Sequence, residues 1–433
     1  MIDRALIIRA GGLYLPTLLA TVLGWRRLRT PRQIAALLAG VCWCLPLLLS
    51  VQLLNLRFRW WIFHAHGGMI RGMPADMLLG WTLLWGAVPI LGFPRAKAWI
   101  AVMIFIAADL VLMPLCAPVV ELSPRWLIGE TVAVMLVLIP AQLFSRWTWH
   151  EANLAGRGLL WAATAVALLL FLLPELVFAV TGREGWQRAL AAPSWLRNLE
   201  VQVAVLVGVP ALSAAQEFVR RGRGSPIPFD PPQRLVSSGL YRYIASPMQV
   251  SGMLVIMAWG LLLRNVWLVA AGPVIFIYGV GIAHWHEHTD MERRFGEAWL
   301  TYSRHVPAWS PRWKPWHDPA TPMPRLYIAD GCGPCSEVRR WFEHRHPFAL
   351  ELLAAEDHPD TDLSRMTYDP CDGTPPEQGV AAFARGLEHL NFAWAFLGAV
   401  ARLPGVSQFV QLLLDSSGFG PQIIERRRCP RSA

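Results

Sequence analysis

Long apolar runs, each about the length of a membrane-spanning helix, dominate the first two thirds of the chain. A helix needs about 20 apolar residues to cross a bilayer. Hydrophobic residues make up 54% of the 433 residues and charged residues only 16%, which is too apolar for an ordinary water-soluble protein. We therefore predict a polytopic α-helical membrane protein with about nine transmembrane helices. The predicted spans are Leu6–Trp25, Gln33–Leu54, Ala75–Phe93, Ala98–Val119, Trp126–Phe144, Gly158–Val180, Val201–Phe218, Met248–Leu263 and Val266–Ala283.

The net charge of +9 comes from arginines scattered over the short loops between these runs. No basic helix or stacking platform accompanies them, so we expect no nucleic-acid partner. Alternating spans place thirteen of the loop arginines and lysines on one side and nine on the other. The richer side faces the cytoplasm in most membrane proteins. This predicts a multi-pass protein of a bacterial inner (cell) membrane, with an outside N-terminus and a cytoplasmic C-terminal domain.

Two polar segments bracket the last two apolar runs. The first reads G-L-Y-R-Y-I-A-S-P-M from Gly239, and the second reads H-E-H-T-D-M-E-R-R-F-G-E-A-W-L-T-Y-S-R-H-V-P from His286. Together they resemble the isoprenylcysteine carboxyl methyltransferase and phospholipid methyltransferase family over about residues 224–313. The residues at matching offsets are Gly239, Tyr241, Pro247, Met248, Glu287, Phe295, Gly296, Tyr302, Val306 and Pro307.

The resemblance implies an integral-membrane enzyme that transfers a methyl group from S-adenosylmethionine to a lipidic or membrane-embedded acceptor. It implies cofactor binding by Tyr241, Ser246, Pro247, Glu287, His288 and Tyr302. The chain departs from the family at four places. Ala245-Ser246 replaces an arginine followed by histidine or asparagine, His288 replaces a second glutamate, and Trp299 replaces a tyrosine. The lost arginine is a cation that could pair with the cofactor carboxylate.

The cluster of His284, His286, Glu287, His288 and Asp290 allows three readings. His284 and His288 are four residues apart and would share one helix face, as metal ligands can. The cluster could equally be the polar end of a helix at the membrane surface, or part of the cofactor site. We predict no metal here.

The composition changes after residue 313, where Pro315, Pro319, Pro322 and Pro324 indicate a linker. Beyond it we predict strands at Arg325–Ala329 and Phe348–Ala354 and helices at Ser336–His344, Glu377–Ala401 and Val406–Leu414. The predicted organisation is an N-terminal transmembrane bundle (1–219), a methyltransferase-like membrane module (220–313), a linker (314–323), an α/β domain (324–425) and a basic tail (426–433).

Cys332-Gly-Pro-Cys335 lies where a predicted strand gives way to a helix. Amide groups at a helix N-terminus stabilise a thiolate, and two intervening residues let the second cysteine resolve a mixed disulfide on the first. The motif resembles the thioredoxin fold, and the domain is similar to the DCC-type thiol-disulfide oxidoreductases. That resemblance implies catalysis by Cys332 and Cys335, a dithiol, disulfide or small-thiol partner, and a cis-proline, for which Thr374-Pro375 is the candidate. Half of a zinc site and a redox-inert relic are the alternatives, and Cys371 is a possible third thiol.

Three functions therefore compete. The first is methyl transfer, with membrane lipid as surroundings or acceptor. The second is a non-catalytic methyltransferase-like scaffold whose working activity is thiol-disulfide exchange at Cys332 and Cys335. The third is a transporter or lipid-binding bundle, which the first seven spans alone would permit. Asp109 and Glu130 lie inside apolar spans, where carboxylates are costly and often functional, and the alternative is that they are neutral and hydrogen-bonded to neighbouring helices.

Overall fold

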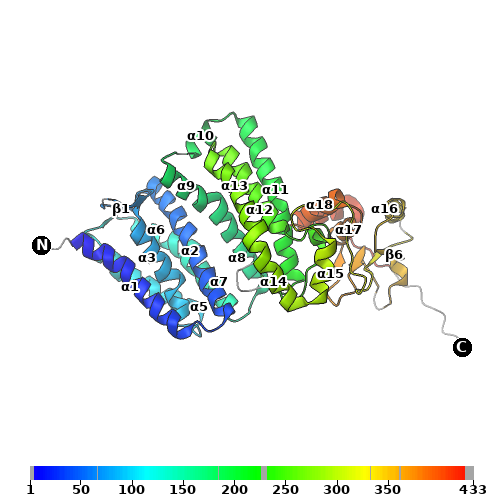
Figure 1. Ribbon diagram of the computed structural model, residues 1–433, viewed down its shortest axis with the longest axis horizontal. Coiled ribbons are helices and arrows are strands. Elements are labelled where there is room, and N and C mark those ends of the chain that lie inside the picture. Colours follow the sequence, from blue (N-terminus) through cyan, green and yellow to red (C-terminus); the bar gives the residue numbers. More distant parts are fainter. Residues whose placement is uncertain are drawn as a thin grey trace. The chain divides into compact units, whose positions relative to one another are not determined.

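The structure is a computed structural model that describes residues 4–65, 67–183, 185–225, 232–331, 333–359 and 362–424, without the side chains of residues 278 and 282–287 (Figure 1). The chain divides into two compact units. The first comprises residues 1–191, 223–233 and 263–265, and the second comprises residues 192–222, 234–262 and 266–433.

The first unit is a bundle of long apolar helices. Its helices are α1 (Arg4–Arg27), α2 (Pro31–Phe58), α3 (Ala75–Gly86), α4 (Val88–Gly92), α5 (Ala98–Leu115), α6 (Trp126–Ala133), α7 (Ile139–Trp149), α8 (Leu154–Ala167), α9 (Leu173–Thr181) and α10 (Trp186–Ala191). Two π-helical turns, η1 (Val134–Leu138) and η2 (Leu168–Leu172), join α6 to α7 and α8 to α9. Each precedes a proline, Pro140 or Pro174, which cannot donate a backbone hydrogen bond.

Small residues let α3 approach its neighbours closely. A Cβ atom added at Gly86 would lie 2.9 Å from the backbone of Gly40 on α2. A Cβ atom at Gly80 would overlap the backbone of Gly12 on α1. Close backbone approach at glycine is a common way for helices to associate in lipid, where no hydrophobic force drives them together. The packing of α1, α2 and α3 therefore depends on these glycines.

If successive helices cross the membrane in alternating directions, the loops of the first unit fall into two sets, one at each end of the bundle. Contacts between the loops fit this division. β1 (Trp61–Phe63) pairs antiparallel with β4 (Val120–Leu122), so the segments after α2 and α5 lie together. At the other end of these helices, Arg146 donates to Ala96 O at 2.9 Å, and His150 Nε2 donates to Pro94 O at 2.9 Å. Successive loops thus lie at alternate ends of the bundle. Which compartment each end faces stays a prediction.

The second unit begins with α11 (Ser194–Arg220), a 27-residue apolar helix. A 3-10 turn, η3 (Gly239–Arg242), leads into the hairpin of α12 (Pro247–Leu262) and α13 (Val266–Tyr278). A π-helical turn, η4 (Gly279–Ala283), carries α13 into α14 (His284–Phe295), and α15 (Glu297–His305) follows. The predicted hairpin and the two polar segments that bracket it are thus present.

Seven helical segments of the described chain are long and apolar enough to cross a membrane, or eight if one bent pair counts as a span. Seven of the nine predicted spans correspond to those seven segments. The two arms of the hairpin, α12 and α13, are shorter apolar helices. The chain is therefore a polytopic helical membrane protein with seven to eight candidate spans and a mixed α/β region at its C-terminal end.

That α/β region is built on a four-stranded sheet in the order β6-β5-β7-β8. β5 (Arg325–Ile328) runs parallel to β6 (Glu351–Ala354) and antiparallel to β7 (Thr367–Asp369), which pairs antiparallel with β8 (Glu377–Gln378). The helices are α16 (Gly333–His344), α17 (Val380–Leu387), α18 (Phe392–Ala401) and α19 (Val406–Leu414), with the turns η5 (Ala355–Asp357) and η6 (Asp415–Phe419). Leu326, Ile328 and Phe342 lie at the centre of the core.

Three predictions for this region are wrong in detail. The strand predicted at Phe348–Ala354 begins only at Glu351. The helix predicted at Glu377–Ala401 is β8 followed by α17 and α18, because Gly379 takes a positive φ of 60° and Asn391 caps a new helix by accepting from Trp394 N. No peptide bond of the described chain is cis, so Thr374-Pro375 is not the predicted cis-proline.

Candidate functional site

A pocket of about 300 Å³ lies between the two polar segments that bracket the α12–α13 hairpin. One wall is the turn before α12, and the other is formed by α14, by α15 and by the segment after α15. The lining residues are Ala245, Ser246, His288, Trp299, Ser303, Arg304, Val306 and Ala308. Its volume is at the lower end of the range for small-molecule sites, which is about 300–1,000 Å³.

Backbone hydrogen bonds hold the two walls together. Ala245 N donates to Pro307 O at 2.9 Å, and Ser246 N donates to Ala308 O at 3.1 Å. Further along, Arg312 N donates to Tyr243 O at 3.0 Å, and Trp316 N donates to Arg242 O at 2.9 Å. The segments before α12 and after α15 thus run side by side, so the frame of the pocket depends on the main chain rather than on its lining side chains.

The structure separates the predicted cofactor residues into lining and supporting ones. Ser246 and His288 line the pocket, and Pro247 is the first residue of α12 beside it. Tyr302 is 1% exposed and lies behind the lining, where its hydroxyl donates to Tyr241 O at 2.8 Å. Tyr241 is also buried. Glu287 is on α14, and its side chain lies outside the described part of the structure.

Six lining residues were not among the predicted site residues, and three of these six, Trp299, Ser303 and Arg304, lie on α15. Trp299 and Ser303 are four residues apart on α15 and so share one helix face, which is a signal that the sequence already carries. The ring of Trp299 meets that of His288 edge-on, with the ring centroids 5.7 Å apart. Among the described residues, Trp299 Nε1 is buried and has no hydrogen-bond partner. The lining therefore includes an aromatic side chain and the Arg304 guanidinium.

The four departures from the family pattern that the sequence shows lie on this lining. Ala245, Ser246, His288 and Trp299 all line the pocket. Gly239, Tyr241, Pro247 and Tyr302, which match the family pattern, lie outside the lining, whereas Val306 matches the pattern and lies on it. The departures thus change the chemistry of the pocket and leave its frame intact.

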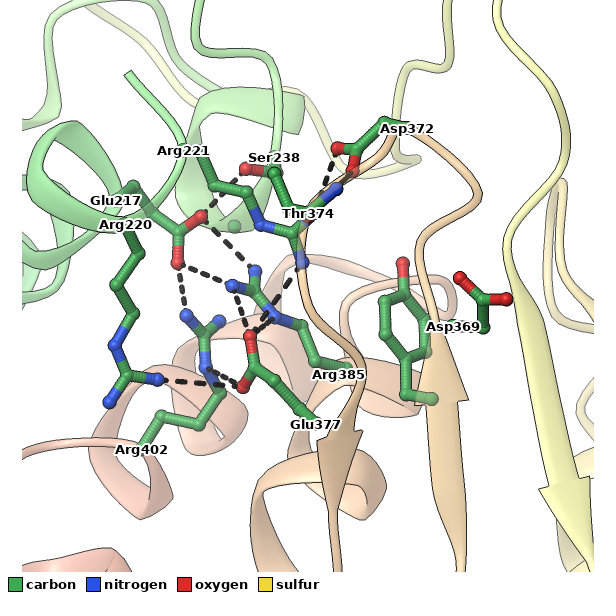
Figure 2. A network of polar contacts seen from close by, with 12 residues as sticks. Glu217, Arg220, Arg221, Ser238, Asp369, Asp372, Thr374, Glu377, Arg385 and Arg402 are labelled. Carbon is green, nitrogen blue, oxygen red and sulfur yellow. Dashed lines mark hydrogen bonds and ion pairs between the residues drawn. The ribbon is translucent and has the colours of Figure 1, made fainter. Parts of the chain in front are cut away.

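A group of charged side chains forms a buried ion network between the end of α11 and the C-terminal helices (Figure 2). Glu217, one turn before the end of α11, is fully buried and pairs with Arg385 on α17 and Arg402 after α18. Arg385 Nε also donates to Glu377 Oε1 at 2.8 Å, and its Nη1 donates to Glu388 Oε1 at 3.1 Å. Burial lowers the pKa of Arg385, but the carboxylates of Glu217, Glu388 and Glu377 outweigh burial, so that this pKa lies well above its usual value.

The same network binds the turn that leads into the pocket. Ser238 Oγ donates to Glu217 Oε2 at 2.6 Å, and Gly239 N donates to Glu388 Oε2 at 3.0 Å. Tyr243 OH donates to Glu388 O at 2.9 Å. The turn at residues 238–243 is therefore held by a C-terminal helix pair and by α11 together. Sequence reasoning missed this network, although charged residues inside apolar runs are its signal.

The predicted thiol site is only partly described. Cys332 lies outside the described residues, and Cys335 lies in the first turn of α16. Cys371 is partly buried, and burial together with the neighbouring carboxylate of Asp369 raises the pKa of its thiol. A raised pKa disfavours the thiolate that attacks a disulfide. The described residues hold no group of three potential metal-ligating side chains.

Comparison with known proteins identifies one segment of the chain. The family model described as phospholipid methyltransferase matches residues 223–298, which include η3, the hairpin and all of α14. No curated protein and no solved structure matches the chain. The match ends one residue before Trp299, so Ala245, Ser246 and His288 lie within it and the α15 side of the pocket lies beyond it. A phospholipid methyltransferase family segment, with its hairpin and one wall of the pocket, thus lies within this multi-pass membrane protein.

Proposed function

We propose that the protein is a membrane methyltransferase that uses S-adenosylmethionine and acts on a lipidic or membrane-embedded acceptor. The observation that carries this proposal is the position of the pocket, which is bounded on one side by residues 245 and 246 and on the other by α14, both within the matched segment. The hairpin between them is apolar, so an acceptor dissolved in the bilayer could approach from it. On this proposal, the C-terminal region lies in the cytoplasm of a bacterium.

The lining residues fit the chemical groups of that cofactor, although not in the family's usual way. Arg304 supplies a guanidinium for a carboxylate, in place of the cation lost at Ala245. The face of Trp299 suits a sulfonium or an aromatic base, because a cation is attracted to an indole ring and aromatic rings stack. Ser246, also on the lining, adds a hydroxyl group.

The cofactor, when bound, supplies a methyl group on a sulfonium, which a positioned nucleophile can take without much acid-base help. The contribution of this chain would then be orientation. Trp299, held against His288 and Tyr302, is packed on two sides and can fix the plane of a bound ring. Glu287, one residue before His288 on α14, is the carboxylate that we assign to a hydroxyl or amino group of the cofactor.

Calorimetry on the full chain in lipid nanodiscs tests this assignment. We expect S-adenosylmethionine to bind, and Arg304→Met and Glu287→Ala each to weaken binding by about ten- to a hundred-fold, the effect of one lost charged hydrogen bond of about 1.5–3 kcal/mol. The matched controls are Arg293→Met and Glu297→Ala, two exposed residues on α14 and α15. No heat from the parent protein at millimolar cofactor would end the methyltransferase proposal.

One observation favours a second candidate, in which the methyltransferase-like module is a scaffold and thiol-disulfide exchange is the activity. The sheet combines a parallel β5–β6 pair with antiparallel β7 and β8, and α16 follows β5 directly with Cys335 in its first turn. That arrangement suits a thioredoxin-like site with Cys332 as attacking and Cys335 as resolving thiol. In the variant Cys335→Ser, mixed disulfides should then accumulate on Cys332. Alkylation of both thiols at the rate of an unperturbed cysteine at neutral pH would contradict it.

A further inference from the structure

The helix α19 and the turn η6 present an exposed apolar face. Phe409 is 61% exposed, Leu412 65%, Leu413 49% and Phe419 55%, and no residue of α19 is buried. Positions 409, 412 and 413 follow the spacing of one helix face. A helix of a water-soluble domain turns such a face towards the core. Here the same face points away from the rest of the second unit.

The polar face of α19 instead contacts the protein. Gln411 Oε1 accepts from Val380 N at the start of α17 at 2.9 Å, and Gln411 Nε2 donates to Asp415 Oδ1 at 2.8 Å. Asp415 in turn accepts two hydrogen bonds from the guanidinium of Arg365, at 2.5 and 2.8 Å. Compared with a helix on the surface of a soluble domain, α19 is therefore inside out, which is the arrangement expected of a helix that faces lipid.

The position of α19 along the chain brings it close to a candidate membrane span. Arg402, four residues before the start of α19, pairs with Glu217, and its carbonyl oxygen accepts from Gln216 Nε2 at 3.1 Å. Both partners lie in the last two turns of α11. Four residues extend at most about 14 Å, so α19 begins near the end of that span. The pair α18 and α19–η6 also has the length and apolar character of a span, but it is bent by 85°.

We propose that the apolar face of α19 and η6 lies in the interface of a phospholipid bilayer, as an in-plane helix at the surface that α11 leaves. Helices of this kind bury one apolar face at the boundary between headgroups and acyl chains. The bonds of Gln411 and Asp415 to the rest of the α/β region hold the helix on its surface, which suits an in-plane helix better than a crossing one. The sequence that follows carries Arg426, Arg427 and Arg428, whose charge complements anionic headgroups.

Hydrophobic photolabelling of the full chain in vesicles of phosphatidylethanolamine and phosphatidylglycerol tests this proposal. A lipid-soluble aryl diazirine labels side chains that contact acyl chains, and trypsin then releases residues 403–426, which contain α19 and η6. We expect this peptide to label at a yield per residue close to that of residues 198–220 of α11, and several-fold above that of residues 366–385. The last peptide is the matched control, because it comes from the same α/β region and contains β7, β8 and most of α17.

A triple variant, Phe409→Gln, Leu412→Gln and Leu413→Gln, should remove most of the label from residues 403–426 and leave that of residues 198–220 unchanged. A yield for residues 403–426 no higher than that of residues 366–385 would overturn the proposal. Labelling that appears only after the protein is diluted to monomers in detergent would also overturn it, because a second copy rather than lipid would then cover this face.

Discussion

The substitution Arg385→Met tests whether the buried ion network holds the C-terminal helices to the turn at residues 238–243. Arg385 is 0% exposed, and its guanidinium contacts the carboxylates of Glu217, Glu377 and Glu388 at 2.8–3.2 Å. Methionine fills a similar volume without the charge. The substitution leaves three buried carboxylates with fewer cations, and breaking a buried ion pair in this way costs about 3–5 kcal/mol.

Hydrogen–deuterium exchange of α17 in the full chain measures this cost. A loss of about 3–5 kcal/mol raises the opening equilibrium by roughly two to four orders of magnitude, since each tenfold change is about 1.4 kcal/mol. The amides of Val380–Leu387 should therefore exchange faster by that factor, while those of α2 and α3 in the other unit stay as protected as before.

Arg325→Met is the matched control, because Arg325, the exposed first residue of β5, pairs with Glu351 where solvent screens the charges. It should leave exchange in α17 unchanged. The double variant Glu217→Gln, Arg385→Met removes one charge of each sign and should recover part of the loss. Equal exchange in Arg385→Met and Arg325→Met would refute the reasoning, since the network would then contribute no more than a surface pair.

Three further predictions concern pH, packing and topology. Burial, with Arg242 adding to it, holds the pKa of His389 well below its usual 6.5, so the folded form stays neutral while the unfolded form takes up a proton as the pH falls. The free energy of unfolding of the α/β region should therefore fall by up to about 2 kcal/mol between pH 6.5 and 5, and chemical denaturation should show a flatter profile in His389→Gln. Gly86→Ala should destabilise the first unit by about 1–3 kcal/mol through overpacking against Gly40, as followed by thermal unfolding in detergent, whereas Gly11→Ala, which has open space around it, should not. A reporter fused after Ala433 should be active in the cytoplasm, and activity in the periplasm alone would contradict the predicted orientation.

The spans could be predicted from the sequence because the signal is local. In lipid, an apolar run of sufficient length forms a membrane-spanning helix. The predicted boundaries differ from those of α2 and α5 by only a few residues. The break between α17 and α18 could not be predicted from apolar periodicity, since Leu387, Leu390 and Trp394 continue the helical i, i+3, i+7 spacing across it. At this break, the cap at Asn391 starts the new helix, whereas the positive φ of Gly379 separates β8 from α17.

The candidate site was predictable in position but not in lining. Spacing alone showed that residues 241–247 and 287–302 flank one hairpin, and the pocket lies between them. Which side chains face the pocket depends on how α15 rotates about its axis, and that rotation puts Tyr302 behind the wall and Trp299 on it. The partners Glu217 and Arg385 are 168 positions apart, and no local pattern connects them.

The main-chain pairing of residues 242–246 with residues 307–316 has a consequence for how this pocket can change over time. Ala245 and Ser246 are joined to their partners Pro307 and Ala308 through backbone atoms. Their side chains can therefore be substituted without loss of the hydrogen bonds that hold the two walls together. Selection for a new ligand could thus act on the lining one residue at a time, each step leaving a folded protein. Four departures from the family pattern lie on this lining. Stepwise substitution of lining residues, with the backbone pairing unchanged, would produce such a distribution.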